Sequence, residues 1–444
     1  MNEAFKFGSN PDYRTIEESR ILDLLLLSGW GHELRSGGGA EAAYCTQVAL
    51  EGWIDLGLPY RRSAQGDRLF DPAEVVNFLK WAGLIREDRF WVERYVATGR
   101  RLVTDMHAPN CDPLHPPPPS QLRRKRFEVT LEREFNLEHC PSRNRLRLRL
   151  PLPLEGATLR DLEFTIIPPT STGEIRYSVT PGRLDAVLRG ASGPRATLGV
   201  HASFAALPSS AAEGRSSLTP VEMELYTRPN EGLIQLCPRI RRLSEALAGR
   251  AKEPRIALAH FWHFIIDRLW CGVVHYDQVP LASPLAWVLD TGWFDCQLGS
   301  ALLVGLCRAR GMPARLTSGY MLYPIAPSFH CWAEVWLEGE GWIPLDLLSW
   351  DLSVRGRDVA WADYFFGALD PRLTTQCLPR LFTGLSPVRM PVAWHMLSRP
   401  LQKGIEIGVF SVKTGAMVYL DRIFVRERRS PNRSRVSTPS DVRA

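Results

Sequence analysis

The feature that most constrains the fold is a helix pattern that begins at Cys296 and is followed at once by strand patterns. Apolar residues recur along this helix at a spacing that gives it one buried face, at Leu298, Leu302, Leu303 and Leu306. Gly311 and Pro313 then follow two arginines and signal the end of the helix. Because a helix with one apolar face beside strands needs a sheet to cover it, we expect an α+β fold.

Three strands are expected after this helix, over residues 315–322, 330–338 and 342–346. The second strand alternates between two faces, and the turn EGEG joins it to the third strand as a hairpin. In an antiparallel hairpin, the start of one strand faces the end of its partner. His330 and Asp346 occupy these two positions, so we expect them to lie within hydrogen-bond reach of each other.

The helix and the hairpin together carry the side chains that a thiol-based acyl-transfer site needs. A cysteine nucleophile requires a base that removes its proton, and the base requires a group that orients it. Cys296 lies in the first turn of the expected helix, where unpaired N–H groups and the helix dipole favour the thiolate. Asp295 is placed to cap this helix, although its charge opposes thiolate formation. Taken alone, a cysteine in a helix is more often a small buried hydrophobe.

Residues 291–352 also resemble a known family of enzymes. Four short elements follow one another in the order and at the spacing of that family, namely Arg308–Arg315, Ser318–Tyr320, His330–Glu334 and Gly341–Asp346. They resemble the transglutaminase-like superfamily, in its bacterial type, whose members have a papain-like cysteine-enzyme fold. The resemblance implies that Cys296 is the nucleophile, His330 the base and Asp346 the group that orients the base.

Two details near the nucleophile are less clearly specified by the resemblance. Phe294 stands where many bacterial members have a glycine, and a bulky residue two positions before the thiol can narrow its entrance or change the acyl group that is accepted. Relatives form an oxyanion hole from the backbone N–H of the cysteine and a donor upstream. The upstream candidates here, each of which is equally well explained as a core or surface residue, are Trp262, Trp270, Tyr276 and Gln278.

The remaining patterns divide the chain into five regions. Helix signals dominate its start, a proline-rich stretch follows, and period-two patterns such as Arg145–Leu150 then predict short strands. The expected regions are an N-terminal helical domain (1–105), a proline-rich linker (106–126), a β-rich domain (127–215), a catalytic domain with C-terminal strands (216–427) and a disordered basic tail (428–444). The fold class that we expect is α+β, with a β-sandwich-like domain and an N-terminal helical domain ahead of a papain/transglutaminase-like core.

Composition narrows the setting in which this chain works. Its 444 residues are 45% hydrophobic and 23% charged, as in ordinary globular domains, and no apolar run is long enough to cross a membrane. Nine cysteines without paired spacing predict neither a disulfide framework nor a metal site, so we expect a reducing cytoplasm. The net charge of +6 is mild, and the basic run Arg123–Arg126 is expected to be a solvated linker and not a nucleic-acid site. No cofactor is implied.

Three functions remain compatible with these residues. The first is transfer of an acyl group from a thioester on Cys296 to an amine, and the second is hydrolysis of an amide bond by a cysteine peptidase or amidase. The third is a binding protein that keeps the fold without turnover. The expected acyl substrate is a protein, a peptide or a carrier-bound group, and the acceptor is an amine or water. The triad alone does not distinguish transfer from hydrolysis, because the outcome depends on how well the pocket excludes water.

Overall fold

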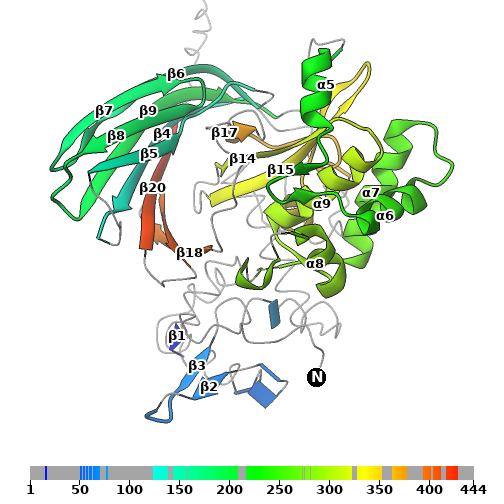
Figure 1. Ribbon diagram of the computed structural model, residues 1–444, viewed down its shortest axis with the longest axis horizontal. Helices are drawn as coiled ribbons and strands as arrows, with labels where there is room; N and C mark the ends of the chain where they lie inside the picture. Colours follow the sequence, from blue (N-terminus) through cyan, green and yellow to red (C-terminus); the bar gives the residue numbers. More distant parts are fainter. Residues whose placement is uncertain are drawn as a thin grey trace, which may run out of the picture.

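A computed structural model gives the fold of the chain (Figure 1). It describes short pieces between residues 16 and 78 and, apart from a few isolated positions, residues 124–428 with gaps at 139–143, 209–216, 323–327, 353–362, 378–393 and 412–416. Most of the expected helical domain, the linker and the basic tail therefore lie outside the described residues. Within the described pieces near the N-terminus, three short strands form a sheet in the order β1-β3-β2, namely β1 (Ile16–Glu17), β2 (Arg61–Arg62) and β3 (Arg68–Phe70).

The β-rich region consists of two facing antiparallel layers. Its strands are β4 (Lys125–Asn136), β5 (Arg145–Pro151), β6 (Leu159–Thr170), β7 (Glu174–Thr180), β8 (Arg183–Arg189) and β9 (Arg195–Ala206). Strands β5, β8 and β7 form a three-stranded sheet, and β4, β9 and β6 belong to a six-stranded sheet. Apolar residues at alternate positions, such as Val129 and Leu131 on β4 and Leu148 and Leu150 on β5, enter one hydrophobic core between the layers.

The last three strands complete this β-rich region, which corrects the expectation that they belong to the catalytic domain. They are β18 (Trp394–Leu401), β19 (Gly404–Ser411) and β20 (Met417–Arg428), and the six-stranded sheet runs β18-β19-β20-β4-β9-β6. Strand β20 pairs antiparallel with β4 along its length, and its Ile423 and Val425 enter the same hydrophobic core. The first and last strands of the stretch from residue 124 to residue 428 thus lie side by side in one sheet (Figure 1). Sequence periodicity could not reveal this pairing, because it shows which face of a strand is apolar and not which partner it joins.

A group of helices lies on the opposite side of the molecule from the β-rich region (Figure 1), namely α5 (Pro220–Tyr226), α6 (Pro238–Ala248), α7 (Pro254–Arg268), α8 (Pro284–Thr291) and α9 (Cys296–Ala309). A further helix, α10 (Leu347–Leu352), follows the last strand of the core sheet hairpin. Four of them begin with a proline, whose missing N–H costs nothing in the first turn. Helix α9 is buried on nearly all sides and ends before Gly311, which adopts the left-handed conformation (φ 77°) expected of a stop signal.

The core sheet lies between these helices and the β-rich region. It contains β14 (Ala314–Met321), β15 (Ser328–Leu337), β16 (Gly341–Leu345) and β17 (Arg372–Cys377), in the antiparallel order β16-β15-β14-β17. One face of β15, which includes Cys331, Ala333 and Val335, belongs to the same hydrophobic core as α9. The expected helix on an antiparallel sheet is therefore confirmed. The opposite face of the core sheet is also buried, because Tyr320, Leu322 and Leu373 enter the hydrophobic core of the β-rich region.

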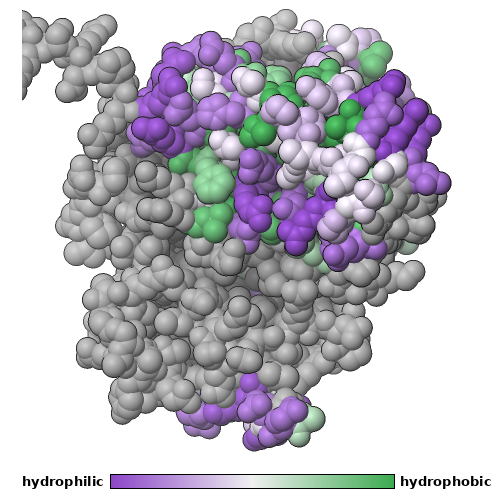
Figure 2. All heavy atoms as spheres, turned by 90° about the vertical axis from the view of Figure 1, so that its left-hand side faces the viewer, coloured by the Kyte–Doolittle hydropathy of each residue, from purple (hydrophilic) through white to green (hydrophobic). Residues whose placement is uncertain are grey.

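The outer surface of the β-rich region mixes polar and apolar residues. Figure 2 shows hydrophilic and hydrophobic residues side by side on the face that lies at the left of Figure 1. Three large hydrophobic side chains are exposed on β6 and β7, namely Phe164, Tyr177 and Val179. Within the described part of the chain, none of the helices has the length and apolar character needed to cross a membrane.

Candidate active site

The nucleophile candidate lies at the first residue of helix α9. Asp295 caps this helix by accepting hydrogen bonds from the backbone N–H groups of Gln297 (3.1 Å) and Leu298 (2.8 Å), as the sequence predicted. Cys296 follows the cap and is partly buried. The short strands β12 (Trp270–Cys271) and β13 (Trp293–Phe294) pair in parallel just before the cap and thereby anchor the segment that leads to the thiol.

A tyrosine supports the capping carboxylate. The hydroxyl of Tyr276, in the short 3-10 helix η3 (Tyr276–Gln278), donates to Asp295 Oδ2 at 2.8 Å. Burial raises the pKa of Asp295, while the hydrogen bonds from Leu298 and Tyr276 act in the lowering direction. The Asp295 carboxylate is therefore occupied by three donors and is not available as a base for the thiol.

The residues expected to be the base and its orienting group form a buried pair. Nε2 of His330 lies 2.8 Å from Oδ2 of Asp346, and both side chains are fully shielded from solvent. This contact is the hydrogen bond expected from the hairpin. Because an ionised carboxylate only accepts hydrogen bonds, Nε2 carries the hydrogen that is donated to Asp346. Nδ1 of His330 has no hydrogen-bond partner among the described residues, and Cys296 lies near enough to the imidazole to raise its pKa.

The charges around His330 favour its protonated form. Burial lowers the pKa of His330, but the charge of Asp346, the hydrogen bond with Asp346 and the nearby Cys296 thiol outweigh this effect and raise the pKa to about 9. For Asp346, burial acts to raise the pKa, but the positive charges of Arg372 and His330 outweigh it and hold the pKa well below its usual value. Only the neutral imidazole can accept the proton of Cys296, and the ionised Asp346 carboxylate then stabilises the imidazolium that forms.

A second thiol opposes this transfer. The pKa of Cys296 lies well above its usual value, first because of a hydrogen bond with Cys331 and second because of burial. The hydrogen bond and the charge of His330 lower the pKa and only partly compensate. The position of Cys331 beside the nucleophile was not predicted from the sequence, where its strand alternation indicated only that it faces away from His330.

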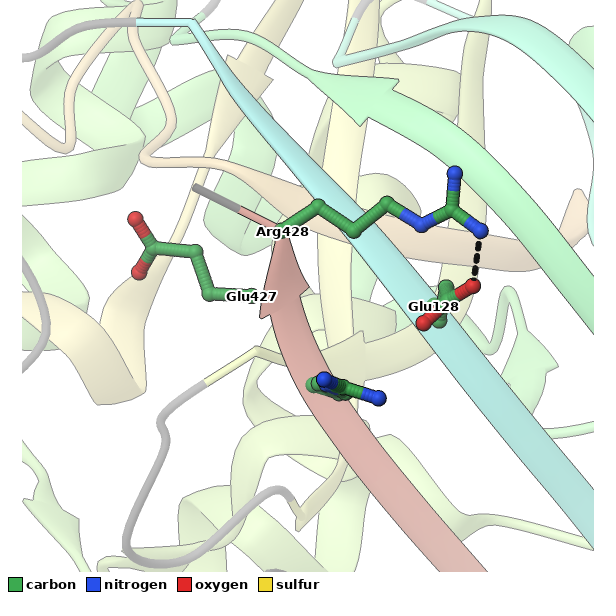
Figure 3. Close-up of a pocket in the computed structure, with 4 residues that line it drawn as sticks. Glu128, Glu427 and Arg428 are labelled. Carbon is green, nitrogen blue, oxygen red and sulfur yellow. Dashed lines mark hydrogen bonds and ion pairs between the residues drawn. The ribbon is translucent and has the colours of Figure 1, made fainter. Parts of the chain in front are cut away.

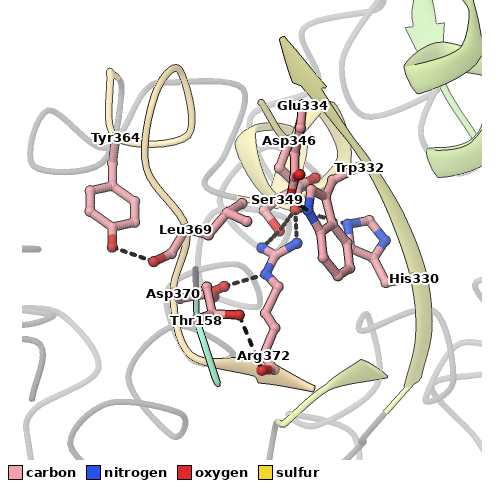
Figure 4. Close-up of polar contacts among 10 residues, drawn as sticks. All are labelled: Thr158, His330, Trp332, Glu334, Asp346, Ser349, Tyr364, Leu369, Asp370 and Arg372. Atoms are coloured by element: carbon pink, nitrogen blue, oxygen red, sulfur yellow. Dashed lines mark hydrogen bonds and ion pairs between the residues drawn. The ribbon is translucent and has the colours of Figure 1, made fainter. Parts of the chain in front are cut away.

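Three further polar residues surround Asp346 and were also not predicted (Figure 4). Ser349 donates from its backbone N–H to Oδ1 (2.9 Å) and from its hydroxyl to Oδ2 (2.8 Å). Arg372 forms an ion pair with Oδ2 and donates from Nη2 to Ser349 Oγ at 2.9 Å. Its Nε donates to Asp370 Oδ1 at 2.7 Å. The sequence around Arg372 resembled a strand of the family, but no signal in it linked this arginine to the triad.

The upstream aromatic candidates for the oxyanion hole mostly have other partners. Trp262 is buried against Trp350 and Phe366 in the helical core, and Trp270 packs against Trp293. The hydroxyl of Tyr276 is used by Asp295, and Gln278 is only partly buried. Among the described residues, Gln278 is therefore the one of these four candidates for which no side-chain hydrogen bond or ring contact is seen.

The side chain of Phe294 packs into the interior next to helix α9. It is 2% exposed and belongs to the hydrophobic core of the helical side. Its ring lies against Gly299, where an added Cβ would come within 2.3 Å of it. Because Gly299, in the first turn of α9, has no side chain, the ring of Phe294 can pack directly against the helix.

Other features of the described residues do not add chemistry at this site. A charged hollow lies at the ends of β4 and β20, where Glu128 forms an ion pair with Arg428 beside Arg426 and Glu427 (Figure 3). These strands belong to the β-rich region and contribute no triad residue. No cluster of three or more histidine, cysteine or acidic side chains is placed to hold a metal ion in the part of the chain that the structure describes.

Comparisons with known proteins agree with the sequence motifs. The sequence model of the transglutaminase-like superfamily matches residues 241–347, which include Cys296, His330 and Asp346. A comparison with curated proteins finds no match.

Solved structures that resemble this chain are distant. A candidate cysteine protease from Cytophaga hutchinsonii has a TM-score of 0.43 and 13% identity, over 70% of this chain and 92% of that one. The periplasmic domain of TgpA from Pseudomonas aeruginosa has a TM-score of 0.29 and 16% identity, over 59% of this chain and 93% of that one.

Proposed function

Residues 241–347 form a transglutaminase-like core, and from this premise we propose that the protein is a thiol enzyme that transfers an acyl group from Cys296 to an amine. The observation that carries the proposal is the buried hydrogen bond between His330 and Asp346, beside a Cys296 thiol that lies near enough to affect the pKa of His330. This arrangement supplies a nucleophile, a base and an orienting group in one connected unit.

The first half of the proposed reaction forms a thioester. His330 Nδ1 takes the proton of the Cys296 thiol, and the thiolate attacks the carbonyl carbon of an amide in the donor. The resulting imidazolium is stabilised by Asp346 and returns the proton to the departing nitrogen as the carbon–nitrogen bond breaks. The acyl group then remains on Cys296, and ammonia or an amine has left.

The second half transfers the acyl group. The nitrogen of a primary amine attacks the thioester carbon while His330 accepts a proton from that nitrogen. The carbon–sulfur bond breaks, the proton passes to the sulfur, and a new amide is released. If water takes the place of the amine, the same steps give hydrolysis. The burial of His330 and Asp346 supports transfer over hydrolysis. In a site with little water, an amine that binds through its own contacts competes better with water for the thioester.

The substrate classes follow from this chemistry. The donor is an amide in a protein or peptide, or a carrier-bound acyl group, and the acceptor is a primary amine. A reducing compartment is the setting that we propose, since the reaction needs Cys296 as a free thiol, and five free cysteines occur among the described residues.

The test is incorporation of a biotin-linked alkyl amine into proteins of a host extract, followed by mass spectrometry. Wild type is compared with Cys296→Ala and with Cys237→Ala, a matched variant of another partly buried thiol. We expect labelled amides with wild type and Cys237→Ala and none with Cys296→Ala. Cleavage products without label, dependent on Cys296, would instead identify a hydrolase. An absence of both would support a binding protein.

A further inference from the structure

Arg372 lies at the centre of a buried polar network beside the triad (Figure 4). Its side chain is fully shielded from solvent and contacts Asp346, Asp370 and the hydroxyl of Ser349. The guanidinium group also lies over the ring of Trp332, with Cζ 5.3 Å from its centroid. A planar group with five donors can meet these acceptors together, and a lysine ammonium cannot.

The Oδ2 atom of Asp346 accepts from three donors, which fixes its direction. His330 Nε2 and the Ser349 hydroxyl each lie 2.8 Å away, and Arg372 is the third donor. Asp370 stands on the far side of Arg372 as a second buried carboxylate. Without the guanidinium, two buried carboxylates would share the site with no fixed positive charge between them, which favours protonation of one of them.

Strand β17 connects this network to the β-rich region. Its residues alternate, so that Arg372 enters the catalytic network while the next residue, Leu373, enters the hydrophobic core of the β-rich region. Two hydrogen bonds from the segment between β5 and β6 also hold strand β17. The Leu154 N–H donates to the carbonyl of Thr374 at 2.9 Å, and the Thr158 hydroxyl donates to the carbonyl of Arg372 at 3.3 Å.

We propose that Arg372 is a positioning residue that aims Asp346 at His330, and that the β-rich region sets its place by holding β17. The proposal rests on the proposed function for the role of the triad. The β-rich region then takes part in the catalytic centre, because it holds the strand β17 that carries Arg372.

The experiment measures alkylation of Cys296 by iodoacetamide between pH 5 and pH 10 in the full chain, with site-specific rates from peptide mass spectrometry. This readout follows the thiol and its base without any substrate, so it stays informative if no amine transfer is found. Arg372→Met removes the charge at similar volume, and Arg372→Lys keeps the charge but not the planar fork. The matched control is Arg133→Met, because Arg133 is a partly buried arginine that is likewise paired with an aspartate, Asp421, in the β-rich region.

The link through β17 is tested by Leu373→Ala against Leu198→Ala. Both leucines are 1% exposed in the same hydrophobic core, but only Leu373 neighbours Arg372. Equal losses of thermal stability in the two variants, with a loss of Cys296 reactivity in Leu373→Ala alone, would separate the positioning effect from general destabilisation.

We expect Arg372→Met to move the inflection of thiol reactivity to higher pH and to lower the rate at pH 7 by about tenfold, since one pKa unit corresponds to a factor of ten. Arg372→Lys should fall between Arg372→Met and wild type, and Arg133→Met should match wild type. Arg372→Met or Arg372→Lys profiles that coincide with wild type would overturn the positioning role. If Arg372→Met does not fold, Arg372→Lys and the leucine pair decide the question. Equal reactivity of the leucine variants would overturn the role of the β-rich region.

Discussion

The hydroxyl of Tyr276 donates to the carboxylate of Asp295, which caps helix α9 immediately before Cys296. The Asp295 carboxylate also accepts from the first turn of the helix, so one tyrosine, one cap and the nucleophile form a connected chain of contacts. The position of the thiol therefore depends on a residue that lies 20 positions earlier in the sequence.

Tyr276→Phe removes this hydrogen bond and leaves the ring in place. We expect a loss of about 1.5–3 kcal/mol in the free energy of unfolding, the usual contribution of a hydrogen bond to a charged group. Urea unfolding followed by circular dichroism measures it. Tyr226→Phe is the control, because the buried hydroxyl of Tyr226 has no hydrogen-bond partner among the described residues. A loss in Tyr226→Phe as large as in Tyr276→Phe would contradict the assignment.

The raised pKa of His330 predicts a pH dependence of stability. Its pKa of about 9 in the folded protein lies above the unfolded value of about 6.5. The folded state thus binds the proton more tightly, and the stabilisation is complete below pH 6.5 and is lost as the pH rises through 9. We expect the stability advantage of wild type over His330→Asn to shrink by about 3 kcal/mol from pH 6 to pH 10.

Unfolding in urea at the two pH values provides this measurement. His263→Asn is the matched control, since His263 has a largely exposed side chain. A change of the same size in His263→Asn would contradict an effect that is specific to the buried His330. A constant difference for His330→Asn would contradict the stabilised imidazolium.

The contact between the two thiols predicts the effect of Cys331→Ala. The hydrogen bond with Cys331 is the largest cause that raises the pKa of Cys296, so its removal should lower that pKa. We expect the inflection of iodoacetamide reactivity at Cys296 to move to lower pH. Cys307→Ala serves as the control, because Cys307 is buried within the same helix and is not among the causes of the shift. An inflection that stays in place in Cys331→Ala would rule out this contact.

Gly319 permits the close approach of β17 to β14. A Cβ added there would come within 1.9 Å of the Leu373 carbonyl oxygen, so Gly319→Ala must push the two strands apart. We expect a loss of about 1–3 kcal/mol in the free energy of unfolding, typical of overpacking, together with slower alkylation of Cys296. Gly156→Ala is the matched control, because an added Cβ would meet nothing within 4 Å there. Equal stability of the two variants would contradict the close approach.

The local part of the site could be predicted from the sequence, because each signal lies within one element. The periodic leucines and the Gly311 stop mark α9, and the hairpin pattern brings His330 to Asp346. These inferences need only the spacing of residues along one helix or two joined strands.

The long-range part could not be predicted in the same way. Arg372 reaches Asp346 through a strand that follows after a long interval, and β20 joins β4 from the opposite end of the described chain. Periodicity identifies the apolar face of a strand but not its partner, and a buried arginine looks in the sequence like any surface arginine. Only the arrangement in space distinguishes them.

The most direct test of a thioester on Cys296 is to isolate it. Wild type is mixed with a host extract, quenched in acid and digested, and the peptides are compared with and without hydroxylamine, which cleaves thioesters. We predict a hydroxylamine-sensitive acyl adduct on the Cys296 peptide that is absent in His330→Asn. The absence of any adduct on Cys296, or an adduct on Cys237 alone, would contradict the assignment of Cys296 as the nucleophile.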